Sequence, residues 1–91
     1  MVAADPETAE THAQEMLAAD LCAMVYQSGK VAGHFEMPLD RLHQQSKRTP
    51  GVTETALILA ERRDWIRRGG SGVTLKAAGI YVAKGALGLP R

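Results

Sequence analysis

The chain has 91 residues, of which 45% are hydrophobic and 23% are charged, and its formal net charge is +1. This composition argues against a chain that is disordered throughout, and the length suffices for one small domain with a single core. The single cysteine, Cys22, excludes an internal disulfide framework. Because Cys22 lies in an apolar helical run, we expect it to be a buried, unreactive thiol.

Charge is distributed unevenly along the chain. Residues 1–20 contain five acidic residues and no Lys or Arg, whereas residues 41–91 contain ten Lys and Arg and three acidic residues. Such segregation favours a basic surface that faces a partner. The alternative is that the acidic first helix lies across the basic half within one fold, and the sequence leaves both open. No stretch is long and apolar enough to span a membrane, and the acidic N-terminus is unlike a signal peptide, which predicts a cytoplasmic protein.

The first half of the chain predicts a long helix, a connector and a short helix. After a loose terminus at residues 1–5, a helix is expected from Pro6 to about Gln27, because apolar residues recur three or four positions apart. Gly29 ends this helix and begins a connector. Residues 34–37 are expected to be a short extended piece, and residues 38–45 a short helix that Pro38 begins.

A second long helix is predicted from Thr49 to about Arg63. Threonine suits the capping position and Pro50 suits the first helical position. Its inward residues are expected to be Val52 or Thr53, followed by Ala56, Leu57 and Ala60. Asp64 follows the helix, where its tolerance of left-handed backbone geometry is useful.

The last third of the chain predicts a β-hairpin and a closing helix. Two short β runs, residues 65–68 and 73–76, flank the sequence Gly69-Gly70-Ser71-Gly72, and a glycine cluster between such runs is a hairpin signal. A final helix is expected over residues 76–87, although Gly79 lies inside it. Residues 85–91 form a tail.

The order of these elements and two segments resemble the winged helix-turn-helix superfamily. The segment Ala56–Ile66 is similar to the end of a recognition helix and the start of a wing, and Val73–Gly79 is similar to the second wing strand and the next helix start. Asp64 stands where glycine is usual, and Lys76 stands where threonine is usual. These degenerate motifs define a superfamily that includes many bacterial regulators, among them the multiple-antibiotic-resistance and arsenic-responsive types.

The resemblance covers roughly residues 13–84 and implies the fold. It implies one α+β, mostly helical domain over residues 1–91, with a three-helix core, a two-stranded wing, a long N-terminal helix and a C-terminal helix. Trp65 is then expected under the wing, and Tyr81 in the core with its hydroxyl at the rim.

The resemblance also implies DNA binding in transcriptional control, with the recognition helix in the major groove and the basic wing on the backbone. Thr53, Glu54, Thr55 and Ile58 are the expected base-reading residues. The full set of expected DNA contacts is Lys47, Arg48, Thr49, Thr53, Glu54, Thr55, Ile58, Arg62, Arg67, Arg68 and Ser71. Double-stranded DNA is the expected partner.

Two other interpretations remain open at this stage. The predicted reading face is poor in Arg, Lys, Asn and Gln and carries apolar Ile58, with Leu59 partly exposed, so the same fold would suit a protein–protein interaction module that contacts its partner through these two residues. The basic pairs at 62–63 and 67–68 are alternatively a solvated edge that discourages aggregation of strands.

The first helix has more apolar surface than one narrow stripe, which predicts a homodimer; the alternative is a monomer that buries the whole stripe itself. The expected dimer residues are Ala9, Ala13, Met16, Leu17 and Met24. His12, His34 and His43 lack the spacing of metal ligands, and no catalytic constellation is evident. The sequence therefore predicts no enzyme activity, no metal site and no cofactor.

Overall fold

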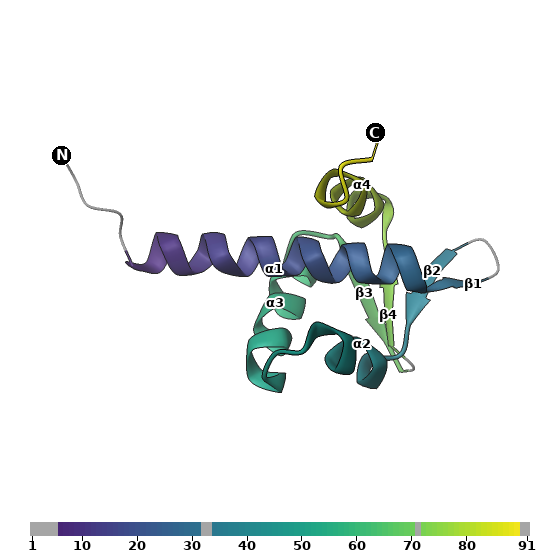
Figure 1. Cartoon of the computed structure of the whole chain (residues 1–91), viewed down its shortest axis with the longest axis horizontal. Coiled ribbons are helices and arrows are strands. Elements are labelled where there is room, and N and C mark those ends of the chain that lie inside the picture. The colour runs from purple at the N-terminus through teal and green to yellow at the C-terminus, as the bar shows by residue number, and fades with distance from the viewer. Residues whose placement is uncertain (1–5, 32–33, 71, 90–91) are drawn as a thin grey trace.

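The computed structural model describes residues 6–31, 34–70 and 72–89, and these form an α+β, mostly helical fold (Figure 1). The elements follow in the order α1 (Pro6–Ser28), β1 (Lys30–Val31), β2 (His34–Met37), α2 (Leu39–Ser46), α3 (Pro50–Arg62), β3 (Ile66–Gly69), β4 (Gly72–Leu75) and α4 (Ala77–Ala86). None of the helices in these ranges is long and apolar enough to cross a membrane. The predicted order of helices and hairpin is confirmed.

Helix α1 is the element around which the others pack. Leu17, Leu21 and Val25 are buried at four-residue intervals, and Ala18 and Cys22 widen the same buried face. In the view of Figure 1, α4 lies above α1, whereas α2 and α3 lie below it. At its N-terminal end α1 extends beyond the other elements (Figure 1). Only the C-terminal part of the helix is therefore enclosed by the fold.

The strands form one antiparallel sheet in the order β1-β2-β4-β3. Strand β3 pairs with β4 from Ile66 opposite Leu75 to Gly69 opposite Gly72, which confirms the predicted glycine hairpin. The two flanking glycines belong to the strands, and Ser71 in the connection lies outside the described residues. Strand β1 was not predicted, because it is only two residues long and pairs with β2 where the sequence shows only a glycine-containing connector.

Local backbone chemistry explains the ends of the two central helices. Thr49 caps α3 and its Oγ1 accepts a hydrogen bond from the Val52 amide at 3.4 Å, with Pro50 as the first helical residue. Asp64 has a φ of 64°, as predicted for the residue that turns the chain from α3 into β3. Lys47 also adopts a left-handed conformation, with a φ of 56°, and ends α2. The turn from α2 to α3 is thus short and sharply defined.

Helix α4 packs so closely on the start of β3 that it needs a glycine. A Cβ on Gly79 would lie 1.9 Å from the carbonyl oxygen of Trp65, which no side chain tolerates. Gly79 and Ala83 face inward four residues apart, and Tyr81, halfway between them, points to the opposite side of the helix. Tyr81 is 54% exposed, so its predicted place in the core is wrong. Trp65 is half-buried and packs against the core.

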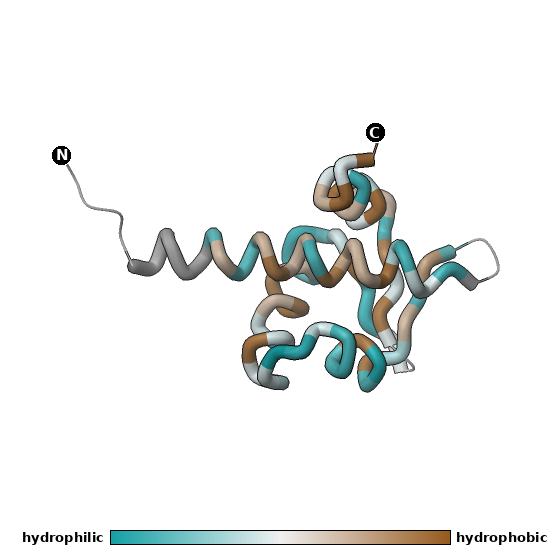
Figure 2. Tube along the Cα trace, viewed as in Figure 1, coloured by the Kyte–Doolittle hydropathy of each residue, from teal (hydrophilic) through white to brown (hydrophobic). Residues whose placement is uncertain are grey.

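The buried side chains of α1, α3 and the sheet form one hydrophobic core. Figure 2 shows hydrophobic residues along α1 and α4, whereas α2 is largely hydrophilic and buries only Leu42 and Ser46. On α3 the buried residues are Thr53, Ala56, Leu57 and Ala60. Of the two alternatives for the first inward position, Thr53 is therefore correct and the exposed Val52 is not.

Candidate functional site

The outward side of helix α3 is one continuous exposed stripe. Gly51, Thr55, Ile58 and Arg62 are exposed and lie four, three and four positions apart, which places them on one face. Ile58 is 41% exposed, as the sequence predicted. The Thr55 hydroxyl donates to the Gly51 carbonyl oxygen at 2.9 Å, so it offers a ligand its lone pairs and its methyl group. The stripe therefore presents a hydroxyl, an apolar side chain and a guanidinium group along about three helical turns.

Thr53 does not belong to this stripe. Its side chain is fully buried, and its Oγ1 lies 3.0 Å from Ser46 Oγ. Ser46 Oγ donates its hydrogen to the His43 carbonyl oxygen at 2.9 Å, so Thr53 must be the donor to Ser46. The prediction that Thr53 reads DNA bases is therefore wrong, because its hydroxyl fixes α2 against α3 inside the protein.

Glu54 and Arg68 were both predicted to contact DNA, but they contact each other. Arg68 Nη1 lies 2.6 Å from Glu54 Oε1, and Nη2 lies 3.1 Å from Oε2, which is a two-bond guanidinium–carboxylate pair. Glu61 adds a longer contact of 3.5 Å to the same guanidinium. The hydrogen bond to Glu54 raises the pKa of Arg68. The pair fastens β3 beside α3 and removes one positive charge from the predicted wing surface.

Other cations near α3 remain uncompensated. Lys47, Arg48, Arg62 and Arg67 are exposed, and in the described part of the chain they form no ion pair. Lys47 and Arg48 lie in the turn before α3, Arg62 is its last residue, and Arg67 lies on the adjacent strand β3. Positive charge therefore flanks the exposed stripe at both ends of α3.

Two neighbouring cations do not contribute to this free charge. Arg63 forms an ion pair with Glu15 of α1, and Lys76 forms one with Asp64. The first pair joins α1 to the end of α3, and the second joins the start of α4 to the turn before β3. Each of these two cations has a carboxylate beside it, in a solvent-exposed pair that contributes little to stability. Lys47, Arg48, Arg62 and Arg67 have no such carboxylate beside them among the described residues.

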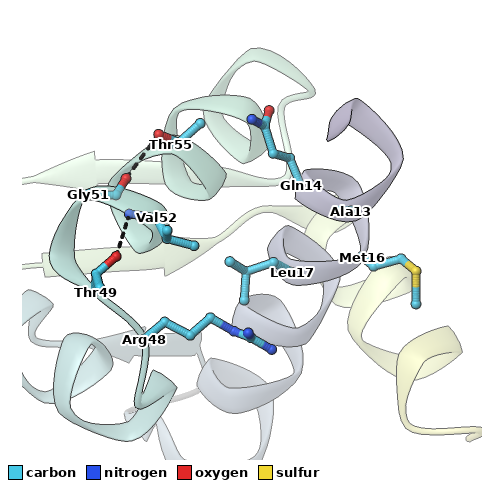
Figure 3. A pocket seen from close by; sticks show the side chains of 9 residues that line it. All are labelled: Ala13, Gln14, Met16, Leu17, Arg48, Thr49, Gly51, Val52 and Thr55. Atoms are coloured by element: carbon cyan, nitrogen blue, oxygen red, sulfur yellow. Dashed lines mark hydrogen bonds between the residues drawn. The ribbon is translucent and has the colours of Figure 1, made fainter. Parts of the chain in front are cut away.

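A groove of about 710 Å³ runs between α1 and the beginning of α3 (Figure 3). Helix α1 lines it with Ala13, Gln14, Met16 and Leu17, and the α2–α3 turn and α3 line it with Arg48, Thr49, Gly51, Val52 and Thr55. Leu17 and Val52 point into the groove from its two sides (Figure 3). The Arg48 side chain extends toward α1 (Figure 3). Arg48 is therefore placed at the groove as well as in the predicted phosphate-binding turn.

The residues predicted for a dimer contact divide into two groups. Leu17 is buried in the core, so its prediction as an interface residue is wrong, because packing within its own chain occupies it. Met24 is half-buried against the core, and its place in an interface stays a prediction. Ala13 and Met16 are exposed, and Met16 is 59% exposed. Ala9 lies on α1, but its side chain is outside the part of the chain that the structure describes.

Cys22 is fully enclosed in the core. Burial raises the pKa of its thiol to about 12, which confirms the expectation of an unreactive cysteine. Within the described ranges, no three His, Cys, Asp or Glu side chains gather as the ligands of a metal ion would. The groove and the stripe on α3 are therefore the surfaces that remain to be explained.

Comparisons with protein-family models, with curated proteins and with solved structures find no match to the chain. The sequence-based prediction missed the Ser46–Thr53 hydrogen bond, the Arg68–Glu54 pair and the groove. Only the Arg68–Glu54 pair had a signal in the sequence, because the two opposite charges stand on a predicted helix and on the hairpin that follows it.

Proposed function

We propose that the protein is a DNA-binding transcription regulator of the winged-helix type. Helix α3 would be the recognition helix and the β3–β4 hairpin the wing. The observation that carries the proposal is the exposed stripe of α3 with uncompensated cations at both of its ends. The element order and the antiparallel pairing of β2 with β4 and of β4 with β3 support the assignment. A bacterial protein that regulates transcription would act in the cytoplasm.

The exposed stripe of α3 can recognise few bases, whereas the flanking cations can give affinity for DNA of any sequence. Arg62 is suited to the two acceptors of a guanine in the major groove, and Ile58 is suited to a thymine methyl group. Lys47 and Arg67 are suited to phosphates, which supply most of the affinity of such proteins. Because Thr53 is buried and Glu54 is paired, few groups remain to read bases. We therefore expect modest sequence selectivity on top of a salt-sensitive general affinity.

The proposal is tested by titrating the protein into a fluorescently labelled duplex of random sequence at several salt concentrations. If DNA contacts the flanking cations, the logarithm of the binding constant should fall by about 0.9 for each phosphate neutralised per logarithmic unit of salt. Absence of binding at low salt would contradict the proposal. Binding that does not depend on salt would contradict the role of the cations.

One observation favours a second function, which is a protein–protein interaction module. Ile58 is exposed on α3 beside half-buried Leu59, and exposed apolar side chains on a helix are typical of a protein contact. An apolar contact should depend weakly on salt and should be lost in Ile58→Lys. In the DNA-binding function, Ile58→Lys should keep or increase the general affinity for DNA, since it adds a positive charge to the stripe.

A further inference from the structure

The groove between α1 and the start of α3 has the size of a small-molecule site. Its volume of about 710 Å³ lies within the range of roughly 300–1,000 Å³ that is usual for such sites. Its walls are apolar where Leu17 of α1 and Val52 of α3 point into it (Figure 3). Val52 is 49% exposed, so this part of the apolar wall faces solvent. The groove therefore offers a ligand apolar surface that the fold leaves open.

Arg48 supplies the one formal charge of the groove. It lies in the turn before α3, and its side chain extends toward α1 (Figure 3). Among the described residues it forms no ion pair. A guanidinium can hold a carboxylate through two parallel hydrogen bonds, and an apolar wall beside it can remove the rest of the ligand from water. The groove is therefore suited to a molecule with a carboxylate at one end and an apolar body.

The other polar groups of the groove are neutral, and two of them are already engaged. The Thr55 hydroxyl donates to the Gly51 carbonyl oxygen at 2.9 Å, and Thr49 Oγ1 accepts from the Val52 amide at 3.4 Å. Gln14 is the other neutral polar side chain of the groove. A sugar or a nucleotide would need many free polar partners. A ligand with a single charged group is the better match.

The apolar body is best matched by an aliphatic chain. Among the described residues that line the groove, none is aromatic, so no ring is present to stack on an aromatic ligand. Helix α3 runs about 9 Å from Thr49 to Thr55, a length that an extended chain of roughly eight carbon atoms would cover. A straight-chain carboxylic acid of medium length therefore fits the groove.

The charge of the first helix argues against a larger acidic occupant. Residues 1–20 contain five acidic residues and no Lys or Arg. An acidic helix of a second protein that lay along the groove would run beside these like charges, which is unfavourable. A small acid places its one carboxylate at Arg48 and meets the walls with uncharged methylene groups.

We propose that the groove binds a medium-chain aliphatic monocarboxylate, whose carboxylate pairs with Arg48 and whose chain lies between Leu17 and Val52. Arg48 is also expected to contact a DNA phosphate, so the acid and DNA would compete for the same guanidinium. The acid would therefore weaken DNA binding, and DNA would weaken binding of the acid by the same factor. The site itself does not depend on DNA binding, whereas this coupling rests on the proposed function.

The first experiment follows the backbone amide signals of the full chain by NMR while sodium octanoate is added without DNA. We expect saturable shifts confined to residues 13–17 and 48–55, with a dissociation constant on the order of 1 mM or lower. Hexanoate should bind about tenfold more weakly, because it lacks two methylene groups. Octylammonium, which has the same chain and the opposite charge, should leave these signals unchanged. An aromatic acid with as many carbon atoms as octanoate should bind more weakly.

Two variants separate the charge from the apolar wall. Arg48→Gln should raise the dissociation constant of octanoate by about tenfold or more and leave the binding of uncharged octanol unchanged. Val52→Glu should weaken the binding of both compounds. It should fold, because Thr49 and a glutamate three residues later form a capping box. Arg41→Gln, an exposed change on α2 that does not line the groove, is the matched control.

The coupling is measured with the labelled random duplex at low salt. Saturating octanoate should weaken DNA binding of the parent chain by about fivefold or more, with equimolar butanoate as the control for ionic strength. The salt slope should fall by about 0.9, since one phosphate contact is lost. The DNA affinity of Arg48→Gln should not respond to octanoate.

The outcomes separate the groove from the DNA-binding function. No shifts at about tenfold above the expected dissociation constant, or shifts spread over the whole chain, would overturn the inference. Unchanged octanoate binding in Arg48→Gln would also overturn it, and tighter binding of the aromatic acid would overturn the assigned ligand class. Binding of an acidic helical peptide in place of octanoate would assign the groove to a protein partner instead.

If octanoate binds but the duplex does not, the groove site stands and the proposed function fails. If the duplex binds but octanoate does not, the groove site fails and the proposed function stands. If both bind without affecting each other, competition for Arg48 is wrong.

Discussion

The guanidinium of Arg68 holds the carboxylate of Glu54 through both of its terminal nitrogens, at 2.6 and 3.1 Å, and so ties strand β3 to the middle of helix α3. Each residue alone fits a DNA contact, Arg68 to a phosphate and Glu54 to a cytosine. Together they satisfy each other. The basic character of the hairpin next to α3 therefore rests on the unpaired Arg67.

The first prediction concerns this pair and DNA affinity. Glu54→Gln removes the negative charge and leaves Arg68 free for a phosphate, so it should strengthen binding to a random duplex and steepen the salt dependence by about 0.9. Arg67→Ala should weaken binding more than Arg68→Ala, because only Arg67 is uncompensated. Fluorescence anisotropy across a salt series measures all three. Equal losses for the two arginine variants would contradict the assignment.

The same pair should contribute little to stability. The side chains of Arg68 and Glu54 are 26% and 40% exposed, so solvent screens their attraction. A double-mutant cycle with Arg68→Ala and Glu54→Ala should give a coupling free energy of roughly 1 kcal/mol or less. Urea unfolding of the parent, the two single variants and the double variant measures it. A coupling of several kcal/mol would show that the pair is a major stabilising contact.

The second prediction separates two threonines on α3. Thr53→Val keeps the shape of the buried side chain but removes the hydrogen bond to Ser46, so the free energy of unfolding should fall by about 1 kcal/mol. DNA affinity should not change. Thr55→Val, two positions later on the exposed side, should alter stability by less than about 0.5 kcal/mol. If Thr53→Val reduced DNA affinity without reducing stability, the buried role of Thr53 would be wrong.

The third prediction concerns two glycines in helices. Gly79→Ala would place a Cβ 1.9 Å from the Trp65 carbonyl oxygen and force α4 away from the turn before β3. We expect a loss of about 3 kcal/mol or failure to fold, at the upper end of the cost of overpacking. Gly51→Ala is the matched control, because its Cβ would meet nothing within 4 Å. It should be neutral or slightly stabilising. Thermal unfolding of both variants tests the contrast.

The fourth prediction follows from the buried thiol of Cys22. Folding raises its pKa from 9.0 to about 12, so the native state keeps the proton where the unfolded chain loses it. The stability that this thiol contributes is therefore complete below the unfolded pKa and declines as the pH rises from 9 toward 12.

Urea unfolding of the parent and of Cys22→Ala at about pH 8 and about pH 10 measures this contribution. The advantage of the parent over the variant should shrink by about 1 kcal/mol at the higher pH. An advantage that is the same at both pH values would contradict the burial of the thiol. Slow labelling of the native thiol at neutral pH provides an independent check, since only the thiolate reacts.

The sequence predicted the elements because their signals are local. Thr49 and Pro50 mark a helix start, Asp64 marks a left-handed turn, and the glycine cluster marks a hairpin, and each acts through its own backbone conformation. The placement of side chains was harder to predict. The exposure of Tyr81 depended on which face of α4 approaches Trp65. Gly79 sets that face through a contact between segments distant in the sequence.

The candidate site shows the same division. The exposure of Ile58 followed from the helical period of α3, but the roles of Thr53 and Glu54 did not. Their roles depend on Ser46 and Arg68, which lie seven and fourteen positions away in the chain. A polar residue near a predicted reading face has no local signal that separates a contact inside the protein from a contact to DNA.

The most direct test of the central claim compares two variants in one DNA-binding experiment. Arg62→Ala/Arg67→Ala removes two uncompensated cations beside the stripe of α3, and Lys84→Ala removes one from α4, on the other side of α1 (Figure 1). If α3 and the hairpin bind DNA, the double variant should lose affinity for a random duplex and its salt slope should fall by about 1.8, with Lys84→Ala close to the parent. Equal behaviour of the parent and the double variant would contradict the proposed DNA-binding surface.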